Sequence, residues 1–234
     1  MDSEARTPTV QICRTCGGGA PIDVHFCPQC TRILTLGRHG DYFAFLGVPR
    51  KLNLDLVDLE QRFRTMSRQF HPDYFHNASL AERRASLEHS SYLNDAYRTL
   101  KHPIDRIEYL LSLESADRQS ARGASGGQEV PASLLEEVFA LNEELDEVRD
   151  LKSSGAPEED WKSRLEQARK PIDEKQAQHE AELRELSTRW DALADDAAVS
   201  ERRSVLEALR DRMLERNYIS NLLAGIEKEM AQIL

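Results

Sequence analysis

A helical repeat of apolar residues that stops at a proline constrains the fold of this chain more than any other feature. Within residues 54–70, large apolar side chains recur at steps of three and four, the spacing of one helix face: Leu56, Leu59, Phe63, Met66 and Phe70. Pro72 ends this repeat because it disfavours helical backbone at His71 and has no amide to donate. A second repeat follows, so the sequence predicts a helical hairpin with His71, Pro72 and Asp73 at its tip.

Two shorter helices are predicted on either side of this hairpin. The stretch "DYFAFLGV", which begins at Asp41, reads as a short aromatic helix before it. The second arm of the hairpin runs from about Leu80, with a set of residues turned inward: Leu93, Ala96, Tyr97 and Leu100. Pro103 ends that arm and opens a further helix, whose apolar residues are Ile107, Tyr109, Leu110 and Leu111.

All four cysteines of the chain lie in one short N-terminal segment. Cys13 and Cys16, then Cys27 and Cys30, form two C-x2-C pairs with a ten-residue spacer. Two such turns can point four sulfurs at one place, the tetrahedral arrangement of a structural zinc site that leaves no open coordination position. Four buried thiols and a redox disulfide pair are the alternatives, although the βαβ context of a thioredoxin-like C-x-x-C is missing. His25 is predicted to be a surface residue rather than a ligand.

Composition and charge limit the remaining classes. The net charge of −10 argues against nucleic acid as the main partner, since phosphate binding requires concentrated positive charge. Residues 41–113 hold ten Lys and Arg against ten Asp and Glu, so the excess acid lies elsewhere. No apolar run approaches the roughly 20 residues of a membrane-spanning helix. The acidic N-terminus lacks the apolar core of a secretory signal, which makes the cytoplasm the expected location.

The C-terminal part of the chain again has a helical pattern. Residues 114–130 are small, polar and glycine-bearing, as in a linker, and residues 131–234 predict a three-helix bundle. On the expected helix of residues 133–151, one face packs the bundle through Leu134, Val138, Leu141, Leu145 and Val148. Leu135 and Phe139 lie off this face, on a line that continues to Glu143 and Glu147. Either they widen the core or they form a docking surface. Trp161 and Trp190 are expected in the core.

In order and spacing, the elements of residues 41–113 resemble a J-domain: the "DYFAFLG" helix, an arginine-bearing helix, His-Pro-Asp, and a helix that ends "NDAYRTL" before a proline. The resemblance implies that His71, Pro72 and Asp73 contact the ATPase domain of a DnaK-type chaperone and stimulate ATP hydrolysis. It also places Arg64 and Arg68 on the docking face. Exposed cations would steer this face toward an acidic partner surface. On this interpretation the chain carries out no chemistry itself and is not an enzyme.

The segments around the J-domain resemble a particular family. "HPIDRIEYLLSL", a linker and "LLEEVFALNEELDEV" are similar to HscB, the iron–sulfur cluster co-chaperone, and the cysteine segment resembles that of animal mitochondrial members. This resemblance implies a DnaK/HscA-type chaperone and an IscU-type cluster scaffold as partners. It places five residues at the scaffold-binding positions: Leu135, Phe139, Glu143, Glu147 and Tyr218, the last in "RNYISNL".

The predicted organisation is therefore mostly α, in four parts: a tetracysteine zinc-knuckle segment at 1–38, a J-domain helical hairpin at 41–113, a linker at 114–130, and the helical bundle at 131–234. Three other functions are alternatives: a general co-chaperone that delivers unfolded clients, a zinc-ribbon nucleic-acid module, and a redox enzyme. The identity of the metal, the role of the cysteine segment and the formation of a homodimer stay open at this level.

Overall fold

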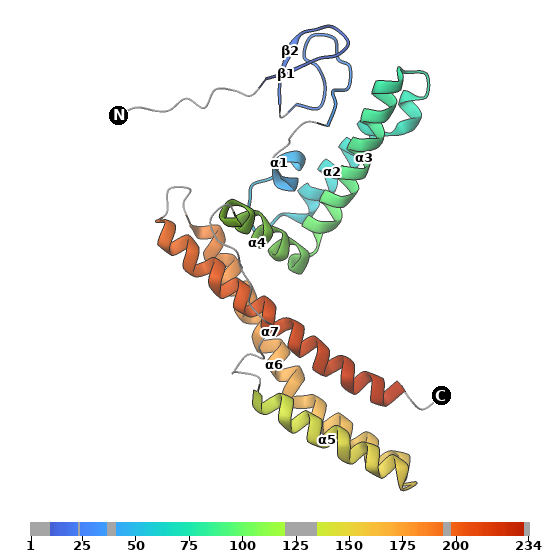
Figure 1. Ribbon diagram of the computed structural model, residues 1–234, viewed down its shortest axis with the longest axis vertical. Helices are drawn as coiled ribbons and strands as arrows, with labels where there is room; N and C mark the ends of the chain where they lie inside the picture. Colours follow the sequence, from blue (N-terminus) through green and yellow to red (C-terminus); the bar gives the residue numbers. More distant parts are fainter. Residues whose placement is uncertain (1–9, 23, 37–40, 120–134, 194–197, 232–234) are drawn as a thin grey trace. The chain divides into compact units, whose positions relative to one another are not determined.

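The computed structural model describes residues 10–22, 24–36, 41–119, 135–193 and 198–231 (Figure 1). The chain forms two compact units, residues 1–117 and 118–234. Helices make up most of both, so the predicted mostly-α class is confirmed. Within the described residues, no helix combines the length and the apolar character that crossing a membrane would require.

The first unit begins with two short strands, a difference from the sequence-based expectation of no clear strand. Strands β1 (Val10–Ile12) and β2 (Gly19–Pro21) pair antiparallel, with Gln11 opposite Ala20. Three residues a strand are too few for an alternating apolar pattern to stand out in the sequence. The helical part follows as α1 (Tyr42–Leu46), α2 (Leu56–Phe70), the 3₁₀ turn η1 (Pro72–Phe75), α3 (Leu80–Lys101) and α4 (Pro103–Gln119).

Side-chain caps decide where these helices begin. Asp55 accepts hydrogen bonds from the backbone amides of Val57 and Asp58, so α2 starts at Leu56 rather than at residue 54. Ser79 and Glu82 form a reciprocal capping box at the start of α3. Helix α4 continues to Gln119, so the first six residues of the predicted linker, 114–119, are helical. Linker residues 120–130 lie outside the described part of the chain.

The core of the first unit confirms most of the predicted inward residues. Leu59, Phe70, Leu93, Ala96 and Leu100 are buried in one cluster with the aromatic residues of α1. The prediction for Leu56 is wrong, because its side chain is 48% exposed. Leu56 is the first residue of α2, and a helical side chain points back toward the N-terminus. No residue of that helix precedes Leu56, so its side chain extends beyond the helix end.

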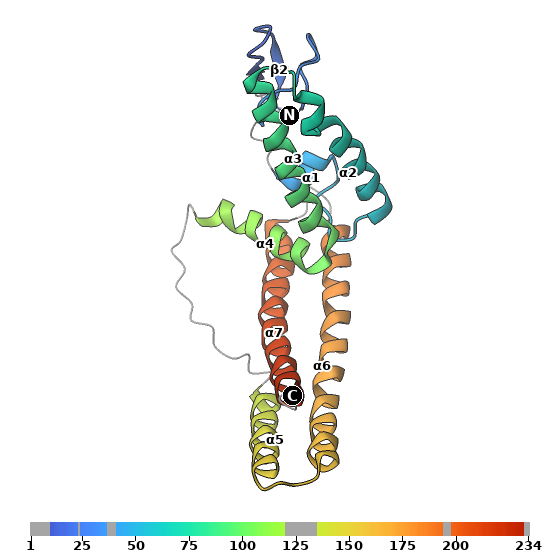
Figure 2. The ribbon, with the colours of Figure 1, turned by 90° about the vertical axis from the view of Figure 1, so that its right-hand side faces the viewer.

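The second unit is the predicted three-helix bundle. Its helices are α5 (Leu135–Ser153), α6 (Glu158–Ala192) and α7 (Val199–Ala231), and α5 lies along only part of the long α6–α7 pair (Figure 2). Leu141, Leu145 and Val148 are buried, as are Trp161 and Trp190. The predicted helix start at Ser133 and the predicted core residue Leu134 lie outside the described residues. Helix α6 runs through Pro171 without ending.

Candidate functional site

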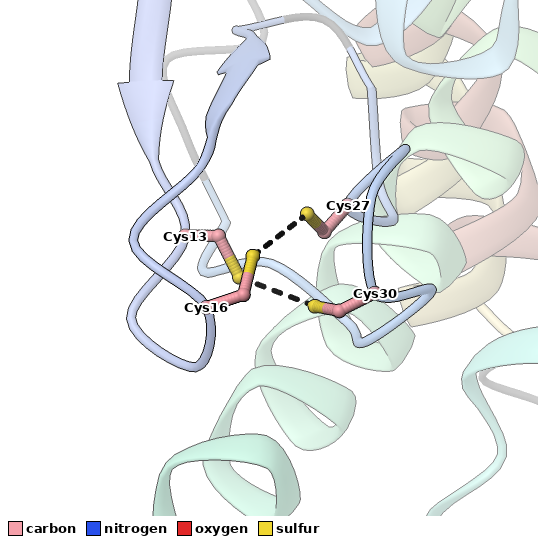
Figure 3. A group of neighbouring side chains, drawn as sticks. All are labelled: Cys13, Cys16, Cys27 and Cys30. Atoms are coloured by element: carbon pink, nitrogen blue, oxygen red, sulfur yellow. Dashed lines mark hydrogen bonds between the residues drawn. The ribbon is translucent and has the colours of Figure 1, made fainter.

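The four cysteine sulfurs converge in the N-terminal segment (Figure 3). The Sγ atoms of Cys13 and Cys30 are 3.6 Å apart, those of Cys16 and Cys27 are 3.7 Å apart, and all four lie within 4.8 Å of one another. Zn–S bonds of about 2.3 Å in a tetrahedron place sulfurs about 3.8 Å apart. None of the four is in a disulfide. The predicted ligands therefore lie together at distances that fit a metal ion.

Each cysteine pair sits in a turn of the same design. The backbone N–H groups of Cys16 and Thr15 lower the pKa of Cys13 to about 6, and the N–H of Cys30 lowers the pKa of Cys27. These bonds favour the thiolate form, which is the form that binds metal. The residue after each pair has positive φ, 73° at Gly17 and 56° at Thr31. Glycine adopts positive φ without strain, whereas threonine rarely adopts it.

The prediction that His25 is a surface residue is wrong. Its ring lies 4.8 Å from that of Phe45 and 5.1 Å from that of Phe70, centroid to centroid, and 5.4 Å from the ring of His89. All three partners belong to the helical part of the first unit. The adjoining Phe26 stacks on Phe70 at 5.8 Å. The cysteine segment thus packs against the helices of the first unit. No sequence pattern predicts this contact.

The tripeptide at the hairpin tip is accessible. His71 and Asp73 are exposed and Pro72 is half-buried. His71 ends α2 with ψ of 126°, the extended conformation favoured before proline. The backbone amide of Asp73 donates to Nδ1 of His71 over 3.3 Å, and that of Tyr74 donates to the His71 carbonyl over 3.0 Å. The loop is therefore ordered by its own hydrogen bonds while its side chains face outward.

A pair of serines from α3 holds the stem of this loop. The carbonyl of Phe70, the residue before His71, accepts hydrogen bonds from Oγ of Ser86 over 2.6 Å and from Oγ of Ser90 over 2.9 Å. The last carbonyls of a helix have no donor within that helix, and here the opposite arm supplies two. Nothing in the sequence marks either serine, because their role depends on how closely the two arms approach.

Both predicted arginines are exposed on the outer face of α2. Arg64 pairs with Glu60 one turn earlier over 2.6 Å, whereas Arg68 forms no ion pair within the described residues. Arg62, another exposed residue of the same helix, donates to the Gly47 carbonyl over 2.9 Å and so ties α2 to α1. Of the two predicted arginines, Arg68 is the nearer to the tip in sequence and Arg64 already has an acidic neighbour.

For Leu135 and Phe139 on α5, the sequence allows two interpretations, a wider core face or an exposed surface, and the structure decides between them. Phe139 is 70% exposed and Leu135 is 40% exposed, so they do not widen the core. Glu143 and Glu147 are exposed as well, and Glu147 pairs with Arg164 of α6. An apolar pair followed by acidic residues therefore runs along the outer face of α5.

Tyr218 belongs to α7 and is half-buried against the bundle core. Its level along α5 follows from the contacts between the two helices. Arg149 donates to Glu229 over 2.9 Å, and a β-carbon at Gly225 would lie 3.9 Å from Leu145. Each of these pairs is separated by 80 positions, so the two helices run parallel in this register. The same offset of 80 places Tyr218 of α7 beside Val138 of α5, which lies between Leu135 and Phe139 in the sequence.

Comparison with known proteins bears on the fold. No protein-family model matches the chain. The crystal structure of the human co-chaperone protein HscB aligns with a TM-score of 0.66 and 24% sequence identity, over 95% of this chain and 100% of that chain. Chaperone HscB from Vibrio cholerae aligns with a TM-score of 0.57 and 27% identity, over 83% of this chain and 100% of that one. The chain therefore has the fold of the HscB co-chaperones, as the resemblance of its motifs predicted.

Proposed function

We propose that this chain is a co-chaperone of iron–sulfur cluster assembly with a separate binding site on each of its two units. The first unit would stimulate the ATPase of a DnaK/HscA-type chaperone through His71, Pro72 and Asp73. The second would bind an IscU-type cluster scaffold through the outer face of α5. The observation that carries the proposal is the exposure of both candidate surfaces, on two units with cores of their own.

The physical features of the hairpin tip support the first role. Pro72 and the hydrogen bonds of the loop limit its conformations, so less entropy is lost when a partner orders it. Arg64 and Arg68 on the outer face of α2 provide the positive charge that would steer an acidic partner surface toward the tip. The tip would act by favouring one conformation of the chaperone, with no covalent chemistry on this chain.

The features of α5 support the second role. Adjoining apolar residues on an outer face mark interaction sites more often than single ones do, and anchors of binding energy are enriched in aromatic residues near the centre of the contact. Leu135, Phe139 and Tyr218 would form the apolar part of the contact. Glu143 and Glu147 would face basic groups of the scaffold, since acidic residues at the rim act mainly on association and orientation.

For the cysteine segment we propose a structural zinc ion held by Cys13, Cys16, Cys27 and Cys30. Bound zinc would supply folding free energy to a segment whose own core is small. The four-part division at 1–38, 41–113, 114–130 and 131–234 and a cytoplasmic location are part of the same proposal.

The first experiment measures ATP hydrolysis by a DnaK/HscA-type chaperone with this protein added. His71→Gln is expected to abolish the stimulation, while the scaffold is expected to increase it for the wild type. His102→Gln is a matched control, because His102 is an exposed histidine outside the tip, at the C-terminal end of α3. Full stimulation by His71→Gln would contradict the role assigned to the tip.

The second experiment measures scaffold binding by calorimetry. Phe139→Ala is expected to weaken binding by roughly thirtyfold, the effect of losing an anchor worth about 2 kcal/mol. Leu135→Ala should weaken it less. Leu214→Ala is the matched control, since Leu214 on α7 is 42% exposed and so resembles Leu135. Equal effects of Leu135→Ala and Leu214→Ala would show that general surface apolarity, rather than this face, binds the scaffold.

The alternative is a general co-chaperone that delivers unfolded clients. The exposed apolar pair on α5 is compatible with client binding, so the two functions are separated by a competition experiment. We expect folded scaffold to bind and denatured polypeptide not to displace it. Displacement of the scaffold by denatured polypeptide would favour the alternative.

A further inference from the structure

The cysteine segment contacts the hairpin at the residue that precedes the tip. His25 and Phe26 lie in the second cysteine turn, residues 24–36. Both rings contact Phe70, at 5.1 and 5.8 Å between centroids. Phe70 is fully buried and is the last residue of α2, directly before His71. The second cysteine turn therefore packs against the entry of the loop that carries His71, Pro72 and Asp73.

The same turn also contacts the exit of that loop. Arg32 donates to Oε1 of Glu82 over 3.1 Å. Glu82 is a buried carboxylate, and its other oxygen accepts from the backbone amide and the hydroxyl of Ser79. Ser79 and Glu82 together start α3, the first helix after the loop. One short segment thus holds both stems of the loop, 71–79.

The second cysteine turn packs on the helices through Ile33, Phe26 and Leu36, but it is joined to the first cysteine turn mainly at the thiolate site. The cysteine segment has a small core of its own. Within the described residues, this core consists of Cys13, Ala20, Cys27 and Leu34. Two of these four are proposed metal ligands. A bound metal would fix Cys27 and Cys30 to the first turn, and with them His25, Phe26 and Arg32 between and beside them in sequence.

We propose that the second cysteine turn positions the tip loop, so that metal occupancy of the four cysteines controls the order of residues 71–79. His25, Phe26 and Arg32 are the positioning residues. The consequence for chaperone stimulation rests on the function proposed above, whereas the coupling between metal and loop does not. A cysteine segment that served only as a separate recruitment module would leave the loop unchanged when the metal is removed.

Amide hydrogen exchange of the full-length protein tests this coupling directly. Zinc-loaded protein is compared with chelator-treated protein. The amides of Asp73, Tyr74 and Ala78 report on the loop because each donates a hydrogen bond within it, and the amide of Glu82 reports on its exit because it donates to Ser79. We expect roughly tenfold faster exchange after metal removal, typical of a local opening equilibrium. Amides of α6 and α7 serve as the internal control. Unchanged exchange at the loop would overturn the proposal.

A variant that keeps the metal distinguishes a local effect on the loop from general unfolding of the first unit. Arg32→Ala removes only the ion pair with Glu82, and the expected effect is about two- to fivefold faster exchange at the start of α3. Arg14→Ala is the matched control, because Arg14 is an exposed arginine between the cysteines of the first turn and forms no ion pair within the described residues. Equal exchange in the two variants would contradict the role of Arg32.

Failure of this inference and failure of the proposed function give different results. If His71→Gln still stimulates the chaperone, the functional proposal fails while the exchange data still decide the coupling. If metal removal leaves the loop amides protected, the coupling fails while the effect of His71→Gln still decides the function. In the case that both hold, chelator-treated protein should stimulate less than zinc-loaded protein, and restored zinc should recover the loss.

Discussion

The two serine hydroxyls on the Phe70 carbonyl allow a quantitative test of how the hairpin tip is held. Ser86→Ala or Ser90→Ala alone removes one hydrogen bond but leaves the other on the same oxygen. The lost bond costs about 0.5–1.5 kcal/mol, and the higher helix propensity of alanine offsets about 0.5 kcal/mol of this. Each single variant should therefore lower the free energy of unfolding by no more than about 1 kcal/mol.

The double variant should cost more than the sum of the two. It leaves a buried carbonyl at a helix end without any donor, which adds a desolvation penalty of about 1–3 kcal/mol. We expect a total of about 1–5 kcal/mol, with a coupling between the two sites of at least about 1 kcal/mol. The reason is that either hydroxyl alone satisfies the oxygen, whereas the loss of both does not.

The assay must report on the first unit, and tryptophan fluorescence does not, because both tryptophans, Trp161 and Trp190, are in the second. Native-state hydrogen exchange of α2 and α3 amides is the suitable measurement. Ser91→Ala is the control, since Ser91 is an exposed serine of α3 and should show the propensity gain alone. Strict additivity of Ser86→Ala and Ser90→Ala would refute the shared-carbonyl argument.

Three further predictions concern the metal segment and the bundle. Gly17→Ala should weaken zinc binding roughly tenfold in a chelator competition, because φ of 73° costs an alanine about 1–2 kcal/mol although nothing blocks its β-carbon. Although burial opposes it, hydrogen bonds from Arg149 and Lys152 hold the pKa of Glu229 below its ordinary value of 4.5. The stability that Glu229 contributes is therefore present above pH 4.5 and is lost as pH falls through the lower pKa of the folded state. In tryptophan-monitored urea unfolding, the free energy of unfolding of Glu229→Gln should be about 1–3 kcal/mol below that of the wild type at pH 7, and the two should converge in acid. Pro171→Ala should raise the free energy of unfolding of the second unit by about 1–3 kcal/mol in the same assay, because it restores an amide inside α6, and a decrease would mean that the bundle requires the proline.

Local chemistry made much of the molecule predictable. The C-x2-C spacing brought four sulfurs to one place because each pair needs only a short turn, and the structure has them within 4.8 Å of one another. The helical repeats predicted the hairpin and the bundle because a helix face is fixed by a period of 3.6 residues. Pro72 predicted the end of α2 because its ring acts on the residue next to it.

Contacts between distant segments were beyond the sequence pattern. His25 was placed at the surface from its neighbours in the chain, yet its surroundings are Phe45 and Phe70. Ser86 and Ser90 carried no signal, because a serine within a helix has many roles and only the approach of Phe70 selects this one. The two short strands are a different case, because three residues a strand are too few to show an alternating pattern even though the strands lie close together in the sequence.

What the sequence by itself determined is the set of helices, the break at His71–Pro72–Asp73 and the four sulfur donors. What only the tertiary structure decided is which apolar residues are covered. Leu56 was predicted inside and Phe139 was left undecided, yet both are exposed. The period of a helix tells which residues share a face, whereas the neighbouring helices determine how far that face extends and where along the helix it is covered.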